Sequence, residues 1–314
     1  MMEEGNVYFS EYLRECREKN GLTQEQLVHA LYSYDIESFE GLDTGTLSKW
    51  ERNVTKPKAS RQVRILKFFQ ERADMALPCW EDYGMEETER IICETGMRNL
   101  LGKSKRLVLN FPSAMIASDD LKVYQLRNTG SIEKIIAINI DLDRDFNRGY
   151  TRLDEEHFMA WALHPSNTFY ICEYQDQFFG LLFTVRLKPE VFRQVVRFEK
   201  SEDELTDDDF ATFDEPGSNY MVSFFAMNDK AAAILFIRYY AHLIANQDVI
   251  EEVGLGTMME DAKKLIGNMN LHPVATQQLE DGRELQMYSE SLPDFIASEK
   301  VLKMIFAKQS CPEE

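Results

Sequence analysis

Apolar residues in the first part of the chain recur at three- and four-residue spacing, which predicts amphipathic helices. The first helix is expected from residue 8 to about residue 20, because Asn20-Gly21 suits the left-handed backbone that ends many helices. Thr23 and Gln26 form a capping-box pattern that predicts the start of a second helix.

Two further helices are predicted before residue 74. Asp43 or Thr44 caps a short third helix, which follows a long polar and aromatic stretch. Pro57 prevents that helix from continuing, and Ser60 is expected to cap a fourth helix. Residues 74–84 show no clear period and are predicted to be a linker, followed by an amphipathic helix over residues 86–101.

The pattern changes after about residue 107, where strands and helices alternate and indicate an α/β or α+β domain. Residues 168–174 and 178–187 are predicted to form a hairpin, and 229–245 a long helix. The Gly-x-Gly stretch at 254–257 is interpreted as a turn because it lacks the rest of a nucleotide motif. The other predicted elements are strands at 220–227, 249–253 and 283–289, and helices at 259–269 and 292–306.

The charge is distributed unevenly along the 314 residues, which carry a formal net charge of −19. Up to Gln70 there are ten Lys or Arg and eleven Asp or Glu, so nearly all the excess negative charge lies in the rest of the chain. This asymmetry indicates two domains with different partners.

Several classes of protein are not favoured by the sequence. No apolar run reaches the ~18 residues of a membrane span, and the acidic N-terminus lacks the pattern of a secretory signal, so we expect a cytoplasmic protein without a membrane partner. The five cysteines are odd in number and lack Cys-x-x-Cys spacing, which predicts reduced thiols. Neither cysteines nor histidines are spaced as metal ligands, so no metal site is predicted.

Three segments in the N-terminal part resemble the helix-turn-helix of Cro/CI-type (XRE) transcriptional regulators. They are GLTQEQL at 21–27, TLSKWERN at 46–53, and Lys56-Pro57 with a following helix. The turn between the second and third helices is about nine residues longer than in that family. The resemblance implies a DNA-binding domain whose recognition helix begins at Thr44 and enters the major groove.

The resemblance also implies roles for individual residues. Arg17 and Glu51 match a partly buried ion pair that ties the first helix to the third. Base edges are expected to be contacted by Thr44, Gly45 and Lys49. Phosphates are expected to be contacted by Gln24, Thr46, Arg52, Lys56, Lys58 and Arg61.

The order of elements in the C-terminal part resembles the acetyltransferase (GNAT) fold. In that family a glycine-rich loop after the central strand cradles the coenzyme A pyrophosphate at a helix N-terminus. The matching stretch here, Asn228, Asp229, Lys230 and Ala231, has no glycine and carries a carboxylate. The family's proton-donating tyrosine aligns with Ile266, which cannot transfer a proton.

We therefore predict an all-α helix-turn-helix domain (1–73), a linker with a helix (74–106), and an α/β (α+β) acetyltransferase-like domain (107–314). The leading interpretation is a DNA-binding transcriptional regulator that binds an operator as a homodimer. Its C-terminal domain senses a small-molecule ligand or dimerises, without catalytic residues or a cofactor. The alternatives are an active acyl-CoA-dependent N-acyltransferase fused to a DNA-binding domain, and a protein-interaction module without a ligand.

Overall fold

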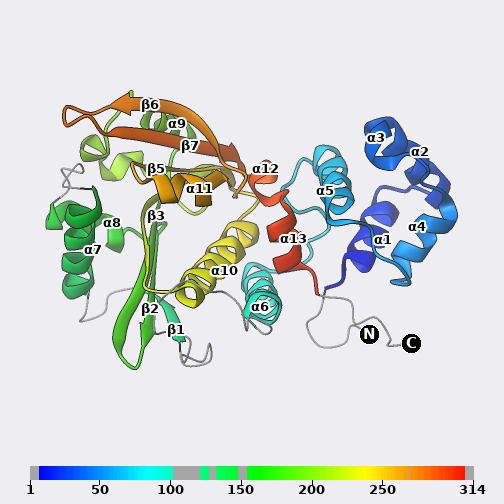
Figure 1. The fold of residues 1–314 in the computed structure, drawn as a ribbon, viewed down its shortest axis with the longest axis horizontal. Coiled ribbons are helices and arrows are strands. Elements are labelled where there is room, and N and C mark those ends of the chain that lie inside the picture. The colour runs from blue at the N-terminus through cyan, green and yellow to red at the C-terminus, as the bar shows by residue number, and fades with distance from the viewer. Residues whose placement is uncertain (1–6, 102–120, 127–131, 148–153, 268, 308–314) are drawn as a thin grey trace. The chain divides into compact units, whose positions relative to one another are not determined.

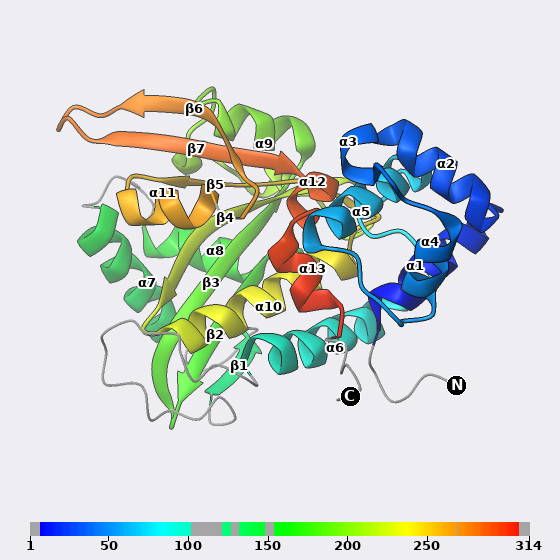
Figure 2. The same cartoon turned by 45° about the vertical axis from the view of Figure 1, so that its right-hand side comes forward.

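The chain divides into two compact units, shown from two directions in Figure 1 and Figure 2. Unit 1 comprises residues 1–105, 237–247 and 293–314, and unit 2 comprises residues 106–236 and 248–292. The computed structural model describes residues 7–101, 121–126, 132–147, 154–267 and 269–307. The division differs from the expected one, because unit 1 also takes two segments from the C-terminal part of the chain. The expected boundary at 106/107 lies outside the described residues.

Unit 1 is helical in its described residues. Its helices are α1 (Phe9–Lys19), α2 (Gln24–Tyr34), α3 (Ile36–Phe39), α4 (Thr44–Glu51), α5 (Ala59–Ala73), α6 (Met85–Gly96) and α13 (Glu299–Ile305), with a π-helical turn, η1 (Met97–Leu101). The end of α10 (Asp229–Ala245) and most of α12 (Leu292–Ile296) also belong to this unit.

Local side-chain chemistry explains where the first helices begin. The Thr23 hydroxyl accepts from the Gln26 backbone N–H at 3.2 Å, and the Gln26 side chain accepts from the Thr23 N–H at 2.8 Å. Asp43 caps α4 by accepting from the Thr46 N–H at 2.6 Å. The expected cap at Ser60 is wrong, because α5 begins at Ala59 and its N-cap is Lys58.

Two segments of unit 1 are more ordered than the sequence pattern indicates. The long stretch between α2 and α4 contains α3, which buries Phe39 completely. The expected linker at 74–84 buries Leu77 and Trp80, although it has no regular period. Periodicity does not predict such burial, because the buried side chains of an irregular segment have no fixed spacing along the sequence.

The described strands of unit 2 form one mixed seven-stranded sheet in the order β1-β2-β3-β4-β5-β7-β6. The strands are β1 (Leu121–Gln125), β2 (Thr168–Tyr174), β3 (Gln177–Leu187), β4 (Gly217–Ala226), β5 (Ile250–Thr257), β6 (His272–Gln278) and β7 (Glu284–Ser291). Only β4 and β5 pair in parallel within this sheet. The helices of unit 2 are α7 (Ile132–Asn147), α8 (Glu155–Leu163), α9 (Pro189–Val196), α11 (Glu260–Gly267) and the first part of α10.

Seven of these elements match the sequence predictions, namely β2, β3, β4, β5, β7, α10 and α11, and the others differ. The Gly-x-Gly stretch at 254–257 is part of β5, so its interpretation as a turn is wrong. Strand β6 was not predicted, because it lies at the sheet edge and is mostly exposed, and therefore lacks an apolar pattern. Strand β1 and helices α7, α8 and α9 were also not predicted, and α9 has Pro189 in its first turn.

The two faces of the sheet are covered by different helices. Leu181, Phe183 and Val185 point to one face, where they share an apolar core with residues of α7, α8 and α9. Gly180 points to the other face, since a Cβ on it would lie 3.1 Å from Leu235 of α10. In the described residues, no helix is both long enough and apolar enough to cross a membrane.

Two glycines of β5 give a test of this packing. A Cβ on Gly254 would lie 2.7 Å from the Phe192 ring and 2.8 Å from the Tyr288 carbonyl oxygen. We expect Gly254→Ala to lower the free energy of unfolding by about 1–3 kcal/mol, because neither ring nor backbone can yield cheaply. Denaturant unfolding measures this change.

Gly256→Ala is the matched control in the same strand. Its Cβ would meet the flexible Met287 side chain, with the sulfur 2.7 Å away, so we expect a smaller loss of stability. Equal losses for the two variants would contradict the close approach at Gly254.

Candidate functional site

A cavity of about 350 Å³ lies in unit 2 beside the ends of β4 and β5. The parallel pairing of these strands runs from Gly217↔Ile250 to Met221↔Leu255. Both strands continue beyond that point, β4 to Ala226 and β5 to Thr257, without further pairing between them. The cavity is lined by Asn139, Leu142, Leu181, Met221, Val222, Ser223, Phe224, Phe225, Ala226, Phe236, Leu255, Gly256, Thr257, Met259, Ala262, Ile266 and Met269.

The lining residues come from both faces of the sheet. Asn139 and Leu142 belong to α7, whereas Phe236 belongs to α10 and packs against Phe224 in a tilted arrangement, with ring centroids 4.6 Å apart. Because α7 and α10 cover opposite faces, the cavity extends between the separated strands from one face to the other. Its size falls within the ~300–1,000 Å³ typical of small-molecule sites.

Few polar groups reach this apolar cavity. Asn139 is 1% exposed, and its Nδ2 has no hydrogen-bond partner among the described residues. The Thr257 hydroxyl accepts from the Met259 N–H at 3.1 Å, and Ser223 supplies a second hydroxyl. None of the described lining residues is an acid, a base, a cysteine or a tyrosine, so this lining offers binding and positioning rather than proton transfer.

At the junction between β4 and α10, the Asn228 side chain caps the start of the helix. The Asn228 Oδ1 accepts from the Ala231 N–H at 2.8 Å, and the Asn228 carbonyl accepts from the Ala232 N–H at 3.0 Å. Asp229 and Lys230 are the first residues of α10. The second bond is the ordinary first bond of the helix, but the first one occupies the Ala231 N–H, which a phosphate at this helix start would need, and the Asp229 carboxylate opposes an anion there. Ile266, at the expected tyrosine position, is buried and lines the cavity.

The residues expected to contact bases lie on the first turns of α4. Thr44, Gly45 and Lys49 are exposed. The residues expected to contact phosphates are more dispersed. Thr46 is half-buried, and its backbone N–H donates to Asp43, which caps α4. Lys56 and Lys58 are exposed on the segment before α5. Arg61 lies in the first turn of α5 and is half-buried.

The side chains of Gln24 and Arg52 make hydrogen bonds within unit 1. The Gln24 Nε2 donates to the Glu51 carboxylate at 2.8 Å, and the Arg52 Nε donates to the Ser48 carbonyl at 3.2 Å. Gln24 therefore acts as a structural partner of Glu51 in this arrangement.

The ion pair between Arg17 and Glu51 is present. The Arg17 Nε lies 2.6 Å from Glu51 Oε1, and its Nη2 lies 3.1 Å from Oε2, which is the two-pronged geometry that guanidinium and carboxylate favour. Glu51 is only 5% exposed. The side-chain hydrogen bond to Glu51 raises the pKa of Arg17, so the guanidinium remains charged.

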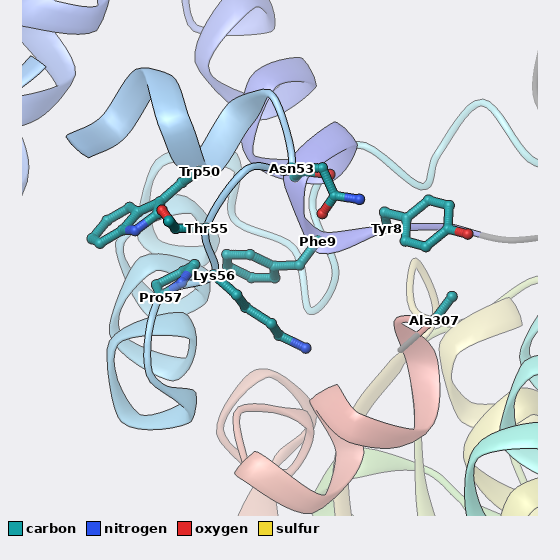
Figure 3. A pocket seen from close by; sticks show the side chains of 9 residues that line it. Tyr8, Phe9, Trp50, Asn53, Thr55, Lys56, Pro57 and Ala307 are labelled. Atoms are coloured by element: carbon teal, nitrogen blue, oxygen red, sulfur yellow. The ribbon is translucent and has the colours of Figure 1, made fainter. Parts of the chain in front are cut away.

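A second hollow lies in unit 1 and is shown in Figure 3. Its lining includes Tyr8, Phe9, Trp50, Asn53 and Lys56, and its volume is about 10 Å³. That volume holds about one water molecule at most, so this hollow is no site for a ligand.

The cysteines show one proximity that the sequence did not reveal. Cys16 and Cys79 are buried with their sulfur atoms 2.9 Å apart, although 63 positions separate them. Burial raises the pKa of the Cys16 thiol, which suppresses its reactivity. Burial also raises the pKa of Cys93 to about 11 and of Cys172 to about 12. Cys311 lies outside the described residues.

Comparison with solved structures finds similar folds for the C-terminal part. FeeM, an N-acyl amino acid synthase from uncultured soil microbes, matches at 11% identity and a TM-score of 0.41, covering 57% of this chain and 94% of that one. The ribosomal-protein-S18-alanine N-acetyltransferase from Escherichia coli matches at 5% identity and a TM-score of 0.36, covering 55% and 94%. No protein-family model and no curated protein matches the chain.

These comparisons change the functional interpretation. They support a GNAT-like α/β fold for unit 2, and at such low identity they concern the fold alone. They give no support to a helix-turn-helix domain of the XRE type. The prediction of a DNA-binding transcriptional regulator is not retained, because nothing in the comparisons supports it and the similar structures that they found are named as N-acyl- and N-acetyltransferases.

The Arg17–Glu51 pair gives a test of the interior of unit 1. Arg17→Met removes both donors and leaves a buried carboxylate, so we expect the free energy of unfolding to fall by about 3–5 kcal/mol. Arg14→Met, at an exposed position of the same helix, is the control and is expected to change stability by less than about 0.5 kcal/mol. Similar small effects in both variants, measured by denaturant unfolding, would show that the pair is not structural.

Proposed function

We propose that unit 2 is an N-acyltransferase domain, which moves an acyl group from a thioester to an amine. The observation that carries this proposal is the apolar cavity between the separated ends of β4 and β5. An acyl group needs an apolar enclosure that an amine can reach, and the cavity passes between the two faces of the sheet. The GNAT-like fold agrees with this function without establishing it.

The open edge of β4 provides a second element of the site. Beyond Met221, β4 still pairs with β3 on one side, through Phe183↔Ser223 and Leu181↔Phe225, but no longer with β5 on the other. Backbone N–H and C=O groups on that side are free of a strand partner among the described residues. Such an edge binds extended amide-containing groups as an added strand would.

The reaction is an aminolysis in which the amine nitrogen attacks the thioester carbonyl carbon. A C–N bond forms, the C–S bond breaks, and the sulfur leaves as a thiol after taking up the proton that the amine loses. Since no described lining side chain can accept that proton, the amine must arrive uncharged and the proton must pass through solvent. The contribution of the protein is then to hold the two reactants in position.

The thiol carrier is recognised without a phosphate cradle at α10. Asn228 caps that helix and Asp229 adds a negative charge to its first turn, so a diphosphate gains little there. The acyl chain and the amides next to the sulfur are the parts of the donor that fit the cavity and the β4 edge.

A direct assay follows the thiol released when a purified chain is mixed with an acyl thioester and an amine. We expect thiol release only when the amine is present. The rates with decanoyl-coenzyme A and with the decanoyl thioester of N-acetylcysteamine should lie within about fivefold of each other, because the nucleotide adds about 1 kcal/mol or less of binding. Ala262→Trp, which fills the cavity, should abolish release.

The control for that variant is Ala137→Trp, which adds the same side chain at an exposed position of α7. It should retain full activity. Thiol release that Ala262→Trp leaves unchanged would contradict the proposed site, and absence of release with a panel of primary amines would contradict the proposed function.

The pH dependence of the transfer rate is the second test. Without a titrating group in the lining, kcat/KM should rise tenfold per pH unit and level off near the pKa of the amine, since only the free base attacks. Replacing the amine by one of lower pKa should move the plateau by the same amount. A bell-shaped profile whose limits do not follow the amine would indicate an enzymic acid and base.

A further inference from the structure

Asn139 is an anomaly within the core of unit 2. Its side chain is 1% exposed, and Nδ2 has no hydrogen-bond partner among the described residues. Buried amide groups in folded proteins are nearly always paired, because an unpaired donor lowers stability. A residue kept in this state at the wall of a cavity indicates a partner that arrives with a ligand.

A second buried asparagine in the same unit shows the usual arrangement. Asn167 is 5% exposed, its Nδ2 donates to the Trp161 carbonyl at 3.0 Å, and its Oδ1 accepts from the Arg186 N–H at 2.8 Å. Asn228, which caps α10 through its Oδ1, also has a buried Nδ2 without a hydrogen-bond partner among the described residues, so an unpaired amide alone does not mark a ligand site. Asn139 differs from both Asn167 and Asn228 because it lines the cavity.

The surroundings of Asn139 define the ligand's chemistry. Leu142 lies one helical turn along α7, and Leu181 and Phe225 form the adjoining sheet surface. A buried, unpaired donor in a mostly apolar wall, which also carries the Ser223 and Thr257 hydroxyls, fits a ligand with a polar acceptor and a long apolar body. At about 30 Å³ for each small group, the cavity holds roughly a dozen non-hydrogen atoms, far more than an acetyl group.

We infer that the cavity binds a linear fatty acyl group of about ten carbons and that Asn139 Nδ2 donates to its carbonyl oxygen. The identification of the ligand as an acyl group rests on the proposed function. In the bound state the donor is satisfied, and the chain lies among the Phe, Leu and Met side chains of the lining. The hydrogen bond fixes the carbonyl at the α7 side of the cavity and makes chain length the basis of selection.

Binding can be measured apart from transfer by using fatty amides, which carry the carbonyl and the chain but cannot acylate an amine. Calorimetry with the full chain compares decanamide, hexanamide and acetamide. We expect affinity to rise by up to about fourfold for each added methylene until the cavity is filled. Equal binding of acetamide and decanamide would overturn the inferred chain length.

Asn139→Leu tests the donor, with stability as the readout that separates a ligand contact from a structural one. We expect this variant to bind decanamide about three- to tenfold more weakly and to have a higher thermal midpoint than the unaltered protein, because it removes an unpaired buried amide. Asn167→Leu is the matched control, for which we expect a lower thermal midpoint and unchanged decanamide affinity in the folded protein.

The outcomes distinguish this inference from the proposed function. Decanamide binding that depends on Asn139, without any acyl transfer, would support the inferred site and overturn only the proposed catalysis. A lower thermal midpoint for Asn139→Leu with unchanged decanamide affinity would show that Asn139 is structural and would overturn the inference, even if transfer is observed.

Discussion

The parallel pairing between β4 and β5 stops at Met221 and Leu255, and the site in unit 2 depends on that interruption. Both strands remain paired on their outer sides, β4 with β3 and β5 with β7. On the paired side, Gly254 permits close contact with Phe192 and the Tyr288 carbonyl. The sheet is therefore tightly packed where β4 and β5 pair, and it holds the cavity where their pairing has ended.

The chemistry of the hollow follows from the side chains that surround it. Aromatic, aliphatic and Met residues dominate, and the described lining has no group that titrates near neutral pH. At the neighbouring helix N-terminus, Asn228 takes the place of a phosphate by accepting the Ala231 N–H. These features favour recognition of an apolar group over recognition of a charged one, in a chain whose excess charge is negative.

Much of the fold was predictable from local signals in the sequence. The capping box at Thr23 and Gln26 correctly located the start of α2, and the hairpin between β2 and β3 turns at Gln175 and Asp176, which both have positive φ. Elements without a local signal were missed, such as the exposed edge strand β6.

The site was less predictable than the fold. The departure from a phosphate-binding loop at Asn228 to Ala231 was visible in the sequence, and the structure supplies its reason in the cap. Asn139 was not identified, because nothing in the sequence distinguishes an unpaired buried amide from a paired one such as Asn167. The resemblance in the N-terminal part led to a wrong functional prediction. The ion pair of Arg17 and Glu51 reflects how the helices pack and does not show what they bind.

Photolabelling with a decanoyl thioester that carries a diazirine on its chain tests the central claim most directly, because it reports where the acyl chain lies whether or not transfer follows. After irradiation and proteolysis, mass spectrometry identifies the labelled peptides. The account predicts labels on the β4 segment from Val222 to Ala226 and on α11, with excess decanamide as a competitor that removes them. Labels confined to unit 1, or labels that decanamide does not displace, would contradict the assignment of the cavity as the acyl site.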